Sequence, residues 1–142
     1  MDNRAFWDRF AWVYDRFMRR FSPEYPELVE RISRDVGEAQ RILEVATGTG
    51  LIALALGAPG RQIEAIDISP PMIARARQKA LARGLDDTRF VVGSAYELPW
   101  VDDCYDLALC GNALHVMEHR RRALAEIERV LKSQGRLILP TY

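Results

Sequence analysis

The chain has 142 residues, and its twenty basic side chains balance its twenty acidic ones. This length fits one domain, and the lack of net positive charge argues against a nucleic-acid partner. No apolar run approaches the roughly 20 residues of a membrane span, and the charged, aromatic N-terminus does not resemble a signal peptide. Two cysteines, Cys104 and Cys110, stand in no metal or redox spacing, so we expect a cytoplasmic protein.

The first 37 residues predict two helices. Apolar side chains recur three or four residues apart, which places them on one helix face. They are Phe6, Phe10, Val13, Phe17 and Phe21. Ser22-Pro23 ends this helix, and a second helix runs over 23–36. The aromatic face is interpreted either as part of the core, which is the commoner meaning of such a face, or as a lid over an apolar substrate.

From residue 38 onward, strands and helices alternate. Short apolar runs predict strands at 41–46, 62–66, 90–92, 105–110 and 136–139. Helices are expected at 51–56, from the Ser69-Pro70 cap to Gly84, and at 121–132. This alternation indicates an α/β fold with a parallel sheet and helices on both faces. We expect a Rossmann-like sheet of order 3-2-1-4-5 with an N-terminal helical extension. We expect one domain over 1–142, with 1–37 as a helical cap and 38–142 as the core.

The loop after the first strand carries the strongest chemical signal, EVATGTG at 44–50. Gly48 and Gly50 permit a sharp turn and a close approach of a ligand to the backbone. Asp67 ends the second strand, where a carboxylate can accept hydrogen bonds from both ribose hydroxyls of a nucleotide. The alternative for Asp67 is a carboxylate favoured only by the following helix N-terminus. Together these features predict a nucleotide cofactor.

Five segments occur in order along the chain: EVATGTG, IDIS, VGSAYELPW, YDLALCGNALHV and RALAEIERVLKSQGRLIL. Their series resembles the motifs of class I methyltransferases that depend on S-adenosyl-L-methionine (SAM), and in particular the ubiquinone and menaquinone biosynthesis methyltransferases. The N-terminal WDRFAWVYDRF is similar to the helical opening of that group. The resemblance covers essentially the whole chain. It implies a SAM-dependent methyltransferase that acts on a small-molecule acceptor, which an apolar compound would suit.

The resemblance also implies roles for individual residues. Glu44 would organise the methionine end of SAM, and Asp67 would hold the ribose hydroxyls. Tyr14 would help to close the pocket from the N-terminal helix. The other residues expected around SAM are Ala46, Gly48 and Gly50 along the methionine and ribose, Ile68 and Met72 against the adenine, Ser94 and Ala95 at its edge, and Cys110, Gly111 and Asn112 beside the sulfonium.

The sequence departs from the family pattern in two places. Ser94 stands where the family often has aspartate, and a hydroxyl cannot give the adenine amino group a charge-assisted bond. The strands that normally follow the fifth strand are also missing from the sequence, which ends at Tyr142. The fifth strand would then form an edge of the sheet. Because such an edge has unpaired backbone groups, we expect a homodimer through it.

Weaker candidates have structural alternatives. His115 and His119 lie four residues apart on an expected helix, but no third ligand accompanies them, so we expect no metal site. His115 and Tyr14 are the candidates for a catalytic role; His115 could act as a base, or it packs beside the site. Arg120-Arg121-Arg122 is interpreted as a solvated start of a helix.

Two other functions stay open on the sequence. The segment GTGLIA also satisfies the G-x-G-x-x-A pattern of NAD-dependent oxidoreductases, and Asp67 suits an NAD ribose equally well. Glu44 argues against this alternative, because an acid is unfavourable beside a pyrophosphate. The third possibility is a truncated SAM-binding domain without turnover.

Overall fold

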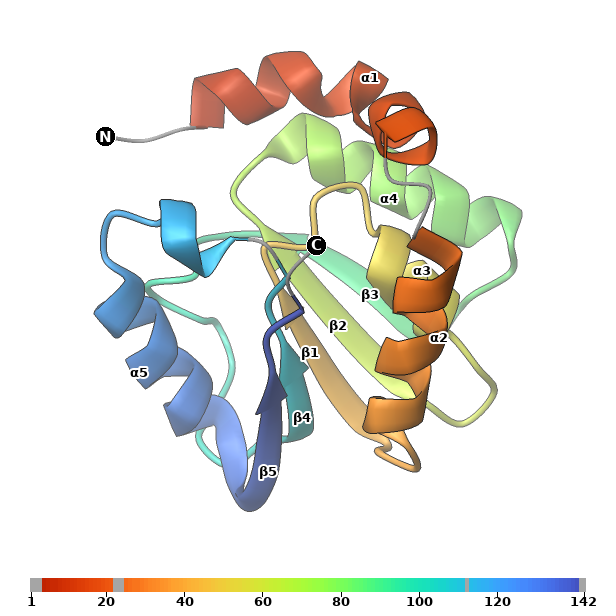
Figure 1. Cartoon of the computed structure of the whole chain (residues 1–142). Helices are drawn as coiled ribbons and strands as arrows, with labels where there is room; N and C mark the ends of the chain where they lie inside the picture. Colours follow the sequence, from red (N-terminus) through yellow and green to blue (C-terminus); the bar gives the residue numbers. More distant parts are fainter. Residues whose placement is uncertain (1–3, 22–24, 112, 141–142) are drawn as a thin grey trace.

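The computed structural model describes the backbone of residues 4–21, 25–111 and 113–140, and their side chains except those of 12, 14, 15, 17–21 and 25. Five parallel strands form one sheet in the order β3-β2-β1-β4-β5 (Figure 1). The strands are β1 (Arg41–Val45), β2 (Gln62–Asp67), β3 (Thr88–Val92), β4 (Tyr105–Leu109) and β5 (Leu131–Ile138). The predicted fold class and strand order are confirmed. Since every strand runs the same way, all carboxyl ends lie at one end of the sheet.

Helices cover both faces of this sheet. They are α1 (Arg4–Phe21), α2 (Tyr25–Val36), α3 (Leu51–Leu56), α4 (Pro70–Ala82), the 3-10 turn η1 (Leu114–Val116) and α5 (Arg120–Val130). Side chains of a strand point alternately to opposite faces. Accordingly Ile63 packs with α2, α3 and α4, whereas Ile66 packs with α5 on the other side. Two buried apolar layers therefore hold the sheet between the helices.

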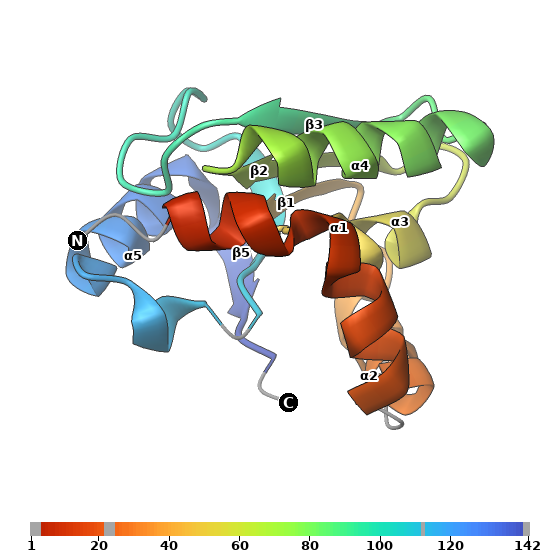
Figure 2. The same cartoon turned by 90° about the horizontal axis from the view of Figure 1, so that it is seen from above.

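The N-terminal helix α1 lies beside α4 and above the carboxyl ends of the strands (Figure 2). Ala11 is its buried contact residue, with 2% of its surface exposed. Phe6 is 60% exposed and stacks on Phe10, with 5.8 Å between the ring centroids. A core role is therefore wrong for Phe6, because the ring lies at the exposed N-terminal end of α1. The side chains of Phe17 and Phe21 lie outside the described set.

The junction between α5 and β5 differs from the prediction. The helix expected over 121–132 ends at Val130, and Leu131 already pairs with Tyr105 of β4. The register then shifts, and regular pairing resumes at Arg136, opposite Leu107. Pairing with β4 thus outweighs the helical propensity of residues 131 and 132. The strand expected at 136–139 lies at the edge of the sheet, as predicted.

Gly50 ties the glycine-rich loop to the core. Its backbone has φ of 81°, and a Cβ atom there would lie 2.6 Å from the ring of Phe90. No side chain fits at that distance, and the left-handed conformation itself disfavours one. The loop therefore packs directly against β3 at this residue.

We predict that Gly50→Ala lowers the free energy of unfolding by about 2–5 kcal/mol, the sum of left-handed strain and overpacking. Gly60→Ala is the matched control, because Gly60 has the same φ of 81° but nothing within 4 Å of an added Cβ. The control is expected to lose only the backbone part, about 1–2 kcal/mol. Urea unfolding of both variants measures the difference, and equal losses would disprove the contact with Phe90.

Candidate functional site

Hydrogen bonds join the glycine-rich loop after β1 to the carboxyl end of β2, and they involve the two carboxylates expected from the sequence, Glu44 and Asp67. The backbone N–H of Gly48 donates to Oδ2 of Asp67 at 2.8 Å. The hydroxyl of Thr47 donates to Oε1 of Glu44 at 2.5 Å, and the N–H of Thr47 donates to the carbonyl of Ile66 at 3.0 Å. Ala46 has φ of 60°, so it starts the turn in a left-handed conformation. The loop thus brings two carboxylates to one end of the sheet.

Glu44 is a buried carboxylate, with only 3% of its surface exposed. Burial raises its pKa to about 7, and the charge of Asp67 adds to this rise. The hydroxyl of Thr47 and the backbone of Ala53 oppose the rise as hydrogen-bond donors. Among the described residues no cationic side chain pairs with Glu44. A positively charged ligand group beside it would therefore be stabilised.

Each oxygen of Asp67 accepts a backbone hydrogen bond, and the backbone of Ile68 is a third donor that lowers its pKa. Ser69 donates its N–H to Oδ1 at 3.0 Å, and Gly48 donates to Oδ2. Burial raises the pKa of Asp67, whereas these backbone donors lower it. An ionised carboxylate has about four lone-pair positions. Asp67 therefore stabilises the start of α4 and still has positions to accept hydrogen bonds from a ligand.

Ser69 connects this carboxylate to the N-terminal helix. Its hydroxyl caps α4 by accepting from the N–H of Met72 at 3.4 Å, which confirms the predicted cap. The same hydroxyl donates to Oδ1 of Asp8 on α1 at 2.5 Å. Sequence reasoning missed Asp8, because nothing local marks a partner 61 residues away. The bond places a third acid near the site, and its charge contributes to the raised pKa of Asp67.

The residues expected around the adenine follow two paired strand ends. Asp67 pairs with Val92, and the N–H of Gly93 donates to the carbonyl of Asp67 at 2.9 Å. Ile68 and Ser94 therefore leave neighbouring strands side by side. Ile68 is 38% exposed, but Met72 is buried, with 2% exposed. Ser94 and Ala95 are half-buried, and the hydroxyl of Ser94 accepts from the N–H of Tyr96 at 3.1 Å.

The residues expected near the reactive end are only partly described. Cys110 directly follows β4 and is 2% exposed. Burial, helped by the charge of Glu44, raises the pKa of its thiol to about 12, so the sulfur stays protonated and is a poor nucleophile. Gly111 follows it and is half-buried. Asn112 and the side chain of Tyr14 lie outside the described set, so their expected roles remain predictions.

The two histidines do not share a helix, which corrects the prediction for them. His115 lies in the 3-10 turn η1, whereas His119 precedes the first residue of α5. Met117 between them has an extended backbone, with φ of −77° and ψ of 135°, which breaks the helical register. His115 is also exposed. Within the part of the chain that the structure describes, no group of three His, Cys, Asp or Glu residues is placed to hold a metal ion.

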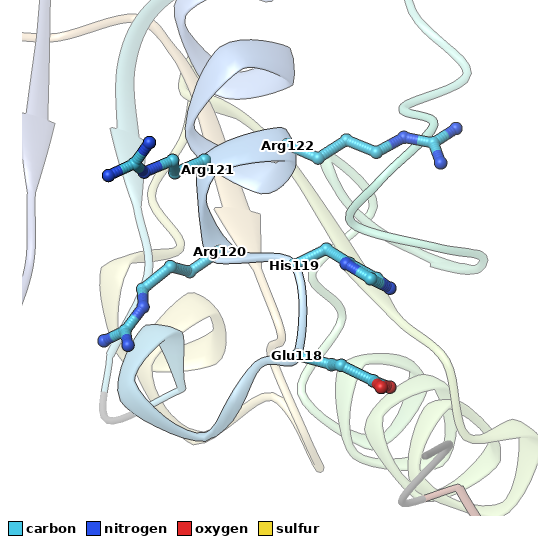
Figure 3. Close-up of a pocket in the computed structure, with 5 residues that line it drawn as sticks. All are labelled: Glu118, His119, Arg120, Arg121 and Arg122. Carbon is cyan, nitrogen blue, oxygen red and sulfur yellow. The ribbon is translucent and has the colours of Figure 1, made fainter.

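A surface pocket lies at the start of α5, away from Glu44 and Asp67. It is lined by Glu118, His119, Arg120, Arg121 and Arg122. Figure 3 shows that Arg120 and Arg121 point to one side and that Arg122, His119 and Glu118 point to the other. Since the side chains diverge, they do not form one binding site. The arginine triplet is an exposed helix start, as the sequence suggested.

Comparison with known proteins agrees with this geometry. Residues 43–139 match the family model described as a methyltransferase domain. The demethylmenaquinone methyltransferase of Thermus thermophilus is 42% identical over 102 residues, which cover 70% of this chain and 46% of that protein. The chain spans about half the length of the curated relatives it matches. No described helix is long and apolar enough to cross a bilayer.

Two solved structures share the fold over almost the whole chain. A putative SAM-dependent methyltransferase from Methanococcus maripaludis has a TM-score of 0.84 and 25% identity, and the match covers 94% of this chain and 63% of that one. A SAM-dependent methyltransferase from Thermotoga maritima, described as a possible histamine N-methyltransferase, has a TM-score of 0.76 and 27% identity, covering 94% of this chain and 58% of that one.

The raised pKa of Glu44 predicts a pH dependence of stability. Between the ordinary value of 4.5 and about 7, the folded chain keeps a proton on Glu44 that the unfolded chain has lost. The contribution of this proton to the free energy of unfolding is therefore fully present below pH 4.5 and is lost as the pH rises through about 7. The loss amounts to about 3 kcal/mol, since each unit corresponds to about 1.4 kcal/mol.

Glu44→Gln removes this titration. We therefore expect the free energy of unfolding of the variant, relative to that of the native chain, to increase with pH. Urea unfolding of both chains at pH 5 and pH 8 measures the effect. Other titrating groups are common to the two chains and cancel in the comparison. If both chains change in parallel with pH, Glu44 does not have the raised pKa.

Proposed function

The chain belongs to the methyltransferase-domain family, and on this premise we propose that it transfers the methyl group of its cofactor SAM to a small apolar acceptor. The observation that supports the proposal best is the pair of buried acids, Glu44 and Asp67, on the glycine-rich loop at the end of β1 and β2. The family match over 43–139 also favours SAM over NAD.

The chemistry of the two acids fits SAM. When bound, SAM supplies a methyl group on a positively charged sulfur. Its methionine end also carries an ammonium group, and its ribose carries two hydroxyl donors. Glu44, whose buried carboxylate lacks a cationic partner among the described residues, would hold the positive methionine end. Asp67 would accept from the ribose hydroxyls with the lone pairs that Gly48 and Ser69 leave unused.

We assign the adenine to the neighbouring ends of β2 and β3. Ile68, 38% exposed, offers an apolar surface to the ring, whereas Met72, 2% exposed, has little surface to offer. Ser94 and Ala95 would border the edge of the ring, and Ala46, Gly48 and Gly50 would follow the methionine and ribose. Cys110, Gly111 and Asn112 would lie beside the sulfonium, where the acceptor enters.

Catalysis in this proposal depends on position. Displacement at a sulfonium needs no protein nucleophile, which agrees with a protonated Cys110. The protein instead aligns the acceptor with the methyl group and excludes water, and alignment alone is worth about 7–11 kcal/mol. The buried ends of the strands would exclude water from one side of the site. His115, exposed on η1, stays a weak candidate for a base that takes a proton from the acceptor.

The proposed acceptor class is testable with compounds named by the relatives. We expect labelled SAM to methylate a short-chain demethylmenaquinone in its reduced form, because an electrophilic methyl group needs an electron-rich carbon. Histamine is the polar alternative, from the name of the Thermotoga maritima structure. Methylation of histamine alone would contradict an apolar acceptor. SAM binding with no transfer to either compound would favour the alternative of a SAM-binding domain without turnover.

We predict that Asp67→Ala weakens the binding of the product S-adenosylhomocysteine (SAH) by about 10- to 150-fold. A hydrogen bond to a charged group is worth about 1.5–3 kcal/mol, and each 1.4 kcal/mol is tenfold. Isothermal calorimetry measures the affinity. Asp86→Ala is the matched control, because it removes the same charge from an exposed position outside the site. Equal affinities of the two variants for SAH would contradict a contact between Asp67 and the ribose, and Asp67 would then act only at the start of α4.

We also propose self-association through the β5 edge. Within the described part of the chain, β5 pairs only with β4. Leu139, just after it, is 47% exposed. Arg136 provides a counter-argument, because it donates to the carbonyls of Asp35 and Val36 at the end of α2 and partly covers this edge from within the chain. Sedimentation at micromolar concentration tests the proposal, and a stable monomer of 16.2 kDa would contradict it.

A further inference from the structure

We propose that Arg129 and Glu126 of α5 are positioning residues that hold the β3–β4 connection in the shape that recognises the adenine. The inference rests on the proposed function, since it concerns the loop that contains Ser94 and Ala95. Neither residue was a candidate in the sequence, because both belong to an amphipathic helix whose polar side chains usually face solvent.

Arg129 binds the connection at three points. Its Nη1 donates to the carbonyl of Trp100 at 2.8 Å and to Oδ1 of Asp102 at 2.8 Å. Its Nη2 donates to the carbonyl of Leu98 at 3.0 Å. The planar guanidinium presents these donors from two nitrogens in a fixed geometry, whereas the three N–H donors of a lysine all lie on one nitrogen at the end of a flexible chain. Arg129 therefore fixes three alternate residues, 98, 100 and 102, of a connection that has no strand or helix of its own.

Glu126 completes the attachment. It holds Arg129 by two bonds, from Nε to Oε1 at 2.8 Å and from Nη2 to Oε2 at 3.0 Å. Its Oε2 also accepts from the N–H of Leu98 at 2.7 Å. The pair thus binds both the N–H and the carbonyl of Leu98, as a neighbouring strand would. Leu98 itself is buried, with 4% exposed, so its side chain and its backbone are both fixed.

The attachment reaches the proposed adenine edge through Tyr96. Arg122 donates its Nε to the carbonyl of Tyr96 at 3.1 Å, and the N–H of His119 donates to the Tyr96 hydroxyl at 3.2 Å. Figure 3 shows Arg122 extending to this side of α5. At the other end, Gly93 is bound to the end of β2. Ser94 and Ala95 therefore lie between two fixed points, one on the sheet and one on α5.

This arrangement makes α5 a part of cofactor recognition although it lies on the opposite face from α4. Without the bonds to Leu98, Trp100 and Asp102, the connection would keep its contacts at Gly93 and Tyr96 and the bond from Trp100 Nε1 to Glu64 at 2.7 Å, but its backbone at 98 would lose its polar partners. A shift of Leu98 would pull on Tyr96, two residues away, and through it displace Ala95 and Ser94, so that contacts to the adenine edge would weaken. Contacts to the ribose through Asp67 would stay, because Asp67 is bound by Gly48 and Ser69 instead.

The test compares SAH with S-inosylhomocysteine, which differs only at the adenine edge. The native chain is expected to bind SAH more tightly. In Arg129→Met we expect the dissociation constant of SAH to rise about 10-fold and that of the inosine analogue to change less than about 3-fold, so that the preference for adenine is largely lost. Arg129→Lys is expected to resemble Arg129→Met. Arg121→Met is the matched control, because Arg121 is exposed on the same helix and makes none of these bonds.

A purely structural role predicts a different result. It would lower the melting temperature of Arg129→Met and leave the preference for adenine unchanged, and this outcome overturns the inference. If Arg129→Met does not fold, the milder Glu126→Gln replaces it. This variant keeps the shape of the side chain and loses one acceptor for Arg129 or Leu98. Its ratio of the dissociation constants for S-inosylhomocysteine and SAH then decides. Absence of SAH binding by the native chain would overturn the proposed function itself, and binding without a preference for adenine would overturn only this inference.

Discussion

The buried carboxylate of Glu44 is the constraint on which the rest of the site depends. A charge with 3% of its surface exposed is unfavourable unless something opposes it. Thr47 and the backbone of Ala53 supply part of that opposition, and the pKa of about 7 shows that it is incomplete. The loop that carries these groups is in turn held by Asp67 and by the packing of Gly50 against Phe90. The chain thus keeps a costly acid at the point where a cationic cofactor would neutralise it.

Most of the fold follows from local patterns. Apolar runs and caps such as Ser69 act within a few residues, so the strands and the start of α4 were predictable from the sequence. The expected order of the strands, which depends on long-range pairing, is the order found. The end of α5 was not, because pairing of Leu131 with Tyr105 decides it. The helix expected across His115 and His119 was also wrong, because the backbone of Met117 is extended between them.

The candidate site was predictable only where a motif marks it. Glu44, Asp67 and the glycines lie on one loop and one strand end, and their spacing is visible in the sequence. Asp8 on α1 binds Ser69 beside this loop, and Arg129 on α5 binds the neighbouring β3–β4 connection, both across long separations, and neither carries a local signature. Helices on both faces therefore take part in holding the loops that would surround the cofactor. Segments distant in the chain, α1, the glycine-rich loop, the ends of β2 and β3, and α5, contribute to this end of the sheet.

The most direct test of a SAM site built on Glu44 and Asp67 is a calorimetric titration of the chain with SAM, SAH and NAD under the same conditions. Both sulfur compounds share the ribose and the methionine ammonium that these acids suit, whereas NAD would bring a pyrophosphate toward Glu44. The account predicts that SAM and SAH bind and that NAD binds much more weakly. Tighter binding of NAD than of SAH would contradict it.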